Sequence, residues 1–231
     1  MNESTIHVGD VPGILWTPTV ITPRTPVLLL GHPGGLDRMR PRLLGRAEAA
    51  VAQGFAAATI ELPGSGTRPA WPEIDGARAD LRAAILAGER PGPEVVDRLV
   101  LPLVDRSVPE WQATIDELAR LGIDGPVGIS GGTTAIGVRL AVVDPRIVAV
   151  GLFAGSYLPQ ATLDEARGVT VPMHMLLQWD DVDNDRQAAL ELFDAFGSTE
   201  KTLLANTGGH TGVPASAGVH AMEFFRRHLR S

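Results

Sequence analysis

The sequence predicts an α/β fold, with a mostly parallel central sheet and helices on both of its faces. Short apolar runs of strand length alternate along the chain with segments of helical periodicity. The runs are continuously apolar, as in Val27-Leu28-Leu29-Leu30, which is typical of strands buried on both faces. The chain has 231 residues, enough for one full core, so we expect 1–231 to form a single domain.

The expected elements follow one another with short connections. An antiparallel pair of short strands opens the chain, and strands and helices then alternate. We expect strands at 6–8, 13–16, 27–31, 56–61, 126–130, 147–153, 173–178 and 201–205, and helices at 42–53, 133–143, 185–196 and 214–229.

The segment 67–106 interrupts this alternation because it is longer than one crossover helix requires. Apolar residues recur at helical spacing in both of its halves. Pro102 should bend or end the second helix, and Ser107 with Glu110 resembles a capping box that opens the next. We predict that 67–106 is a helical cap over the carboxyl edge of the sheet, where open α/β sheets bind ligands. The alternative is that these helices pack on the flank of the sheet.

Composition excludes several classes of function. The net charge of -7 argues against a nucleic-acid partner, and no apolar run approaches the length of a membrane span. The absence of cysteine excludes disulfides, cysteine-ligated metals and a thiol nucleophile. The first residues, Met1-Asn2-Glu3-Ser4, carry an acid and no apolar region, so we expect no secretory signal and a cytoplasmic location.

One motif points to a reaction. Gly128-Ile129-Ser130-Gly131-Gly132 lies between a predicted strand and a predicted helix. In that setting Gly-x-Ser-x-Gly is typical of a nucleophile elbow, a sharp turn that exposes a serine hydroxyl above a sheet. A serine nucleophile needs a base that is oriented by an acid, and Asp181 and His210 follow it in that order.

Together these motifs resemble the α/β-hydrolases, and within them the dienelactone-hydrolase-like and small serine esterase branch. The resemblance implies that Ser130 is the nucleophile, Asp181 the acid and His210 the base. Dienelactone hydrolases proper are expected to carry cysteine at the elbow, so the serine points to a serine esterase. The matching segments are Leu30 to Gly35, the elbow, Asp144 to Ile147, Gln178 to Asp181 and Gly208 to His210.

The acid has competitors in the same loop, where Asp180, Asp181, Asp183 and Asp185 lie close together. The acid-loop pattern of the resembling family matches Asp181, and Asp180 is the alternative. Asp185 is expected to be the N-cap or a first-turn acid of the following helix.

A tetrahedral intermediate also requires two backbone N–H donors for its oxyanion. The residue after the nucleophile, Gly131, is expected to supply one. The other is expected from the loop His32-Pro33-Gly34-Gly35, in which Pro33 has no N–H. The resemblance favours Gly34, with Gly35 as the alternative. Glu61, at the end of a predicted strand, is left without a role.

These residues predict a serine hydrolase that cleaves a small neutral or apolar carboxylic ester through an acyl-enzyme. No cofactor is expected and no metal, because the aspartates at 180–185 lack the glycine and terminal glutamate of an EF-hand loop. The same fold and triad could instead serve lactone or amide hydrolysis, acyl transfer or C–C cleavage. A non-catalytic binding protein is the third interpretation. The expected partner is a small-molecule ester, with no membrane; the oligomeric state stays open.

Overall fold

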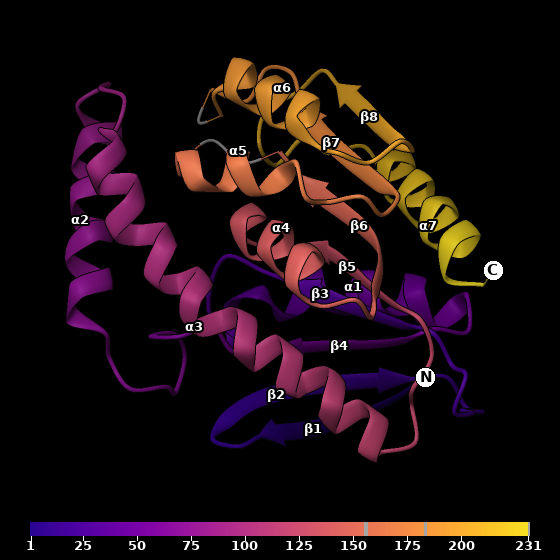
Figure 1. The fold of residues 1–231 in the computed structure, drawn as a ribbon. Coiled ribbons are helices and arrows are strands. Elements are labelled where there is room, and N and C mark those ends of the chain that lie inside the picture. The colour runs from indigo at the N-terminus through magenta and orange to yellow at the C-terminus, as the bar shows by residue number, and fades with distance from the viewer. Residues whose placement is uncertain (155–156, 183, 231) are drawn as a thin grey trace.

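The computed structural model describes residues 1–154, 157–182 and 184–230, and within them the chain forms one eight-stranded sheet (Figure 1). The strand order is β1-β2-β4-β3-β5-β6-β7-β8. β2 pairs antiparallel with both of its neighbours, β1 and β4, and all pairings from β4 to β8 in this order are parallel. The strands are β1 Asn2–Val8, β2 Val11–Thr17, β3 Val27–Gly31, β4 Ala56–Ile60, β5 Val127–Gly131, β6 Ile147–Phe153, β7 Met173–Gln178 and β8 Lys201–Asn206.

Two layers of helices sandwich this sheet, each over its own apolar cluster. α1 and α7 cover one face, and α3, α4, α5 and α6 lie on the other. All residues of β3 and β4 are buried, which confirms that the central strands are covered on both sides. The helices are α1 Leu36–Ala52, α2 Pro72–Leu86, α3 Pro93–Arg120, α4 Thr134–Val143, α5 Gln160–Ala166, α6 Arg186–Ala195 and α7 Ala215–Leu229.

The alternation of side chains along β5 decides where its serine points. Ile129 belongs to the cluster under α3 and α4. Gly128 faces the opposite way, where a Cβ would lie 3.0 Å from the ring of Phe225 on α7. Successive residues of a strand point to opposite faces, so the Ser130 side chain lies on the α1 and α7 side of the sheet.

Most expected elements are confirmed to within a few residues, but α1, α3 and α5 differ from the prediction. α1 begins at Leu36 rather than at 42, because its first backbone N–H has a tertiary partner that the local pattern does not reveal. The short helix α5 was not predicted. Its seven residues are fewer than a periodic pattern needs for detection.

The largest correction concerns α3, which runs unbroken from Pro93 to Arg120. Pro102 does not end the helix, and the predicted capping box at Ser107 is wrong, since Ser107 is a buried residue within the helix. An internal proline costs a helix about 3 kcal/mol. Here a long apolar face extending from Val96 to Leu118 packs on the core and outweighs that cost. Glu110 pairs instead with Arg68, at 2.5 Å.

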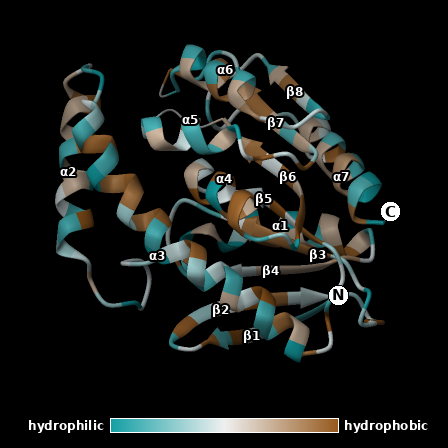
Figure 2. Cartoon of the chain, in the orientation of Figure 1, coloured by the Kyte–Doolittle hydropathy of each residue, from teal (hydrophilic) through white to brown (hydrophobic). Residues whose placement is uncertain are grey.

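The predicted cap forms a helical hairpin. α2 packs along the first half of α3, and both stand on the side toward which the parallel strands point (Figure 1). Hydrophilic and hydrophobic residues are interleaved along this hairpin (Figure 2). Near its tip, the Arg90 guanidinium lies 2.5 Å from the Asp185 carboxylate at the start of α6. The hairpin therefore makes an ion pair with the loop after β7, while its role as a cap stays a prediction. None of the described helices has the length and apolar character to cross a membrane.

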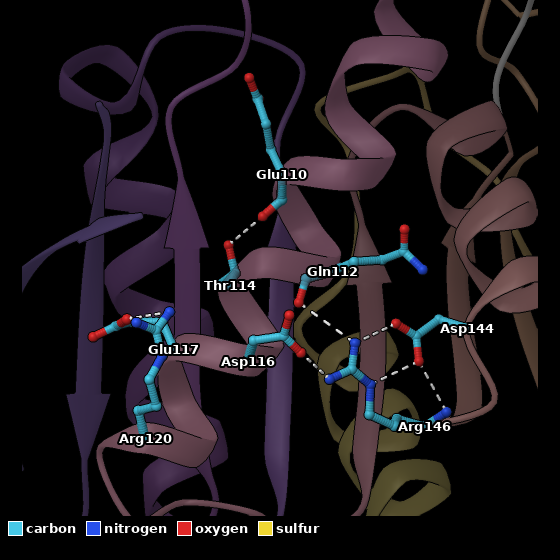
Figure 3. A network of polar contacts seen from close by, with 8 residues as sticks. All are labelled: Glu110, Gln112, Thr114, Asp116, Glu117, Arg120, Asp144 and Arg146. Carbon is cyan, nitrogen blue, oxygen red and sulfur yellow. Dashed lines mark hydrogen bonds and ion pairs between the residues drawn. The ribbon is translucent and has the colours of Figure 1, made fainter. Parts of the chain in front are cut away.

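A polar network around one buried carboxylate joins the start of β6 to α3 (Figure 3). Both oxygens of Asp144, which is 1% exposed, accept hydrogen bonds from the Arg146 guanidinium, at 2.9 and 2.7 Å. Arg146 also donates to Asp116 and to the Gln112 carbonyl on α3. The hydrogen bonds from Arg146 hold the pKa of Asp144 below its usual range. The Asp-Pro-Arg segment that contributed to the family resemblance thus has a structural role here.

We predict that Asp144→Asn lowers the free energy of unfolding at neutral pH by about 1–3 kcal/mol, because a buried charged acceptor is lost. The depressed pKa means that this stability is present above the unfolded pKa and is lost as pH falls through the folded one. Urea titrations across a pH series should therefore show the variant converging on the wild type below about pH 4. Asp116→Asn, at the exposed partner, is the matched control and should change stability by less than about 1 kcal/mol. A difference for Asp144→Asn that does not depend on pH would contradict this account.

Candidate functional site

The acid and the base predicted from the sequence meet at the carboxyl edge of the sheet. Asp181 follows β7 and His210 follows β8, two strands that pair in parallel. The Nδ1 atom of His210 lies 2.7 Å from Oδ2 of Asp181. A carboxylate can only accept, so Nδ1 carries the proton and Nε2 is left as the basic nitrogen. The Asp181 side chain is 1% exposed and that of His210 is 55% exposed, so the pair presents its base to solvent.

Neighbouring residues hold this pair in place. Phe153, at the end of β6, contacts His210 edge to face, with ring centroids 5.3 Å apart. Gln178 donates to the Gly209 carbonyl at 3.1 Å, which fixes the turn before the histidine. The hydrogen bond to Asp181 and the contact with Phe153 together hold the His210 imidazole in one orientation.

The other aspartates of the loop have separate partners. Asp180 accepts from the backbone N–H of Gly208 at 3.2 Å. Asp185 is the N-cap of α6 and accepts from the Ala188 N–H, as one of the two expectations for it stated. Asp183 lies outside the described residues. The structure therefore pairs His210 with Asp181, and assigns Asp180 to the backbone of the histidine turn.

Ser130 is held by a different residue. Its carbonyl oxygen and its hydroxyl both accept hydrogen bonds from Nη2 of Arg46, the hydroxyl at 3.1 Å. Within the described parts of the chain, no hydrogen bond joins Ser130 to His210. The left-handed backbone conformations of the turn fall on Gly131 and Gly132, with φ of 66° and 89°, rather than on the serine. The structure thus places the serine one residue before the sharp turn, and its role as a nucleophile stays a prediction.

The two candidate oxyanion segments begin side by side. Gly31, the last residue of β3, pairs with Gly131 in register. A Cβ on Gly132 would lie 3.1 Å from the backbone nitrogen of His32, so the loop after β3 passes close to the turn after β5. The buried His32 donates from Nε2 to the Ile60 carbonyl at 2.9 Å, and burial lowers its pKa. Gly34 and Gly35 both remain candidates for the second donor.

Little space is enclosed beneath the turn. A cavity of about 10 Å³ lies there between His32, Gly132 and Trp111, room for no more than about one water molecule.

Two charged residues at this edge had no role in the sequence prediction. Arg46 lies on α1, and burial lowers its pKa to about 10. Glu61, 4% exposed, follows β4, and both of its carboxylate oxygens lie 3.1 Å from the Leu36 backbone nitrogen. Glu61 thereby fixes the start of α1, directly after Gly35. No local pattern distinguishes Arg46 from the other arginines of α1, so the sequence could not point to it. Glu61 could have been found, because a charged residue at the end of a predicted strand is a sign of a site.

No family model matches the chain, and no curated protein matches it at the level of sequence. Solved structures match it over nearly its whole length. A cold-adapted esterase from an Arctic intertidal metagenomic library is 25% identical, with a TM-score of 0.75 over 98% of this chain and 93% of that one. A dienelactone hydrolase from Anabaena variabilis is 18% identical, with a TM-score of 0.65 over 99% and 98% of the two chains. An esterase from Pyrococcus furiosus is 11% identical, with a TM-score of 0.67 over 99% and 92%. These likenesses confirm the α/β-hydrolase fold.

Glu61 supplies a pH-dependent prediction. Burial raises its pKa above the value in the unfolded chain. Its contribution to stability is thus fully present below the unfolded pKa and is lost as pH rises through the folded pKa. Glu61→Gln removes this titration and keeps an oxygen for the Leu36 N–H. From about pH 4 to about pH 7, the free energy of unfolding of the variant should therefore rise relative to that of the wild type. Glu48→Gln, on the exposed side of α1, should run parallel to the wild type; a parallel course for Glu61→Gln would refute the prediction.

Proposed function

We propose that this chain, which has the α/β-hydrolase fold, is a hydrolase that cleaves a small neutral or apolar carboxylic ester. The hydrogen bond between Asp181 and His210 carries the proposal, because it leaves a basic nitrogen exposed at the edge where such folds bind ligands. The solved structures of similar fold include several esterases, which supports a hydrolase. The net charge of -7 favours a neutral substrate over a polyanionic one.

The proposed reaction has two steps. The Ser130 oxygen attacks the ester carbonyl carbon while His210 Nε2 takes the hydroxyl proton, and the bond to the alcohol oxygen breaks as His210 returns that proton to the alcohol. Water then attacks the acyl-serine with the same base, which releases the acid and restores the hydroxyl. Asp181 holds the imidazole and stabilises its cation, and the N–H groups of Gly34 and Gly131 face the oxyanion. The Ser130 hydroxyl must come within about 3 Å of Nε2 for the first step.

The contact between Arg46 and Ser130 favours a second candidate, a hydrolase-fold protein that binds a ligand without catalysis. The serine hydroxyl already has a partner there, and the glycines rather than the serine occupy the left-handed turn. Lactone or amide hydrolysis, acyl transfer and C–C cleavage by the same residues are variants of the first candidate, because the fold does not separate them.

Covalent labelling tests the nucleophile. We expect a fluorophosphonate probe to add to Ser130 in the folded protein, with the modified residue identified by peptide mass spectrometry. On a panel of p-nitrophenyl esters, lactones and amides, esters should turn over fastest. Ser130→Ala should lower kcat by at least about 10³-fold. Thr133→Ala, at the N-cap position of α4 where the side chain makes no capping hydrogen bond, is the matched control and should keep both labelling and turnover. A folded wild type that neither labels nor hydrolyses any of the panel would instead support the binding protein.

The paired aspartates give a second test. Asp181→Asn should lower kcat by about 10³- to 10⁴-fold, because an amide in place of the carboxylate no longer fixes the tautomer of the base. Asp180→Asn keeps an oxygen for the Gly208 N–H and should stay close to the wild type in kcat. Steady-state kinetics on the best ester of the panel measure both effects. Equal losses in the two variants, or the larger loss at Asp180, would reverse the assignment of the acid.

A further inference from the structure

We propose that Arg46 is a positioning residue, which fixes the turn after β5 against the loop after β3 and so orients the Gly131 donor and the start of the loop that carries the second oxyanion donor. This inference rests on the proposed function. It goes beyond the triad because it gives a role to a residue on α1 that carries no motif and contacts no part of the Asp181–His210 pair in the described structure.

The contacts of Arg46 reach the ends of two adjacent strands. Nη1 donates to the Gly31 carbonyl at 2.9 Å, and Nη2 donates to the Ser130 carbonyl and hydroxyl. Gly31 and Gly131 lie opposite each other in the parallel pairing of β3 with β5. One planar guanidinium thus joins the last residues of β3 and β5. The candidate oxyanion loop begins directly after the first strand, and the elbow directly after the second.

Because a peptide group is planar, fixing the Ser130 carbonyl also fixes the direction of the Gly131 N–H. The Ser130 carbonyl and the Gly131 N–H belong to one planar trans peptide group, in which they point in opposite directions. Because Arg46 binds the carbonyl on the α1 side, the Gly131 N–H is directed away from Arg46. The same reasoning applies to the Gly31 carbonyl and the His32 N–H at the start of the other loop.

The charge of Arg46 is also unusual in its setting. None of the ion pairs among the described residues includes Arg46, so its partners are carbonyl groups and a hydroxyl. Holding a desolvated cation without a carboxylate costs free energy, and burial accordingly lowers its pKa to about 10. The guanidinium still carries its charge at neutral pH. A hydroxyl that accepts from this cation keeps its own proton to donate to a base, so the contact also orients Ser130.

The test compares substitutions at Arg46 with one at an exposed arginine of the same helix. Arg46→Met should lower kcat by about 10- to 100-fold with KM nearly unchanged, which is somewhat less than the loss of a whole oxyanion donor. Fluorophosphonate labelling of Ser130 should slow in parallel. Arg46→Lys should recover part of the rate, because an ammonium keeps the charge but lacks the planar fork. Arg42→Met, the control, should match the wild type.

A readout other than activity keeps the inference separate from the proposed function. The amide resonance of Gly131 in ¹H–¹⁵N spectra should shift in Arg46→Met and far less in Arg46→Lys, with melting temperatures recorded for both variants. Faster labelling in Arg46→Met would mean that Arg46 restrains Ser130, and would overturn the inference. If the wild type is active and Arg46→Met is equally active, the inference about Arg46 is wrong and the proposed function stands. If the wild type is inert, both the inference and the proposed function are wrong. If Arg46→Met does not fold, the split between kcat and KM in Arg46→Lys decides.

Discussion

The pairing of β3 with β5 in the centre of the sheet is the contact on which the candidate site depends. Gly31 and Gly131 end these strands in register, and a Cβ on Gly31 would lie 2.5 Å from the Gly131 carbonyl oxygen. Only glycine permits two strand ends to approach so closely. The loop of His32 and the turn of Ser130 both leave from this point. The backbone thus sets how closely the two candidate oxyanion segments approach, and Arg46 is proposed to hold them there.

The histidine and its acid depend on the same parallel sheet in a different way. β7 and β8 end together, so the loops after them bring Asp181 and His210 into contact although they are far apart in sequence. The base and the nucleophile candidate arise from opposite sides of β6, whose Phe153 contacts His210. Two strands, β6 and β7, lie between β5 and β8, so the distance between base and serine depends on how far the turn after β8 folds back over them.

The sequence alone predicted the strands well, because they depend on local patterns. Continuous apolar runs marked the central strands, and the family pattern favoured Asp181 over Asp180, the same aspartate that the structure pairs with His210. Pro102 misled the prediction, since a local rule for helix breaking could not include the packing of the apolar face of α3. Arg46 could not be foreseen at all. Its contacts come from β3 and β5, and no periodicity of α1 encodes them. The elbow could be predicted only in part. The motif located the turn, but the side-chain direction of Ser130 depends on where β5 ends.

The continuity of α3 limits how the helical hairpin can move. With 28 residues, α3 is a rod of about 42 Å whose apolar face packs against the core from Val96 to Leu118 and whose first half also contacts α2. A hairpin attached by such a rod has no loop in its longer arm to act as a hinge. Any displacement must be elastic bending, concentrated where Pro102 removes a backbone hydrogen bond, while the Arg90–Asp185 ion pair resists it from the far end. We therefore expect the helical hairpin to move little and as one stiff unit, rather than as a flap on a flexible loop.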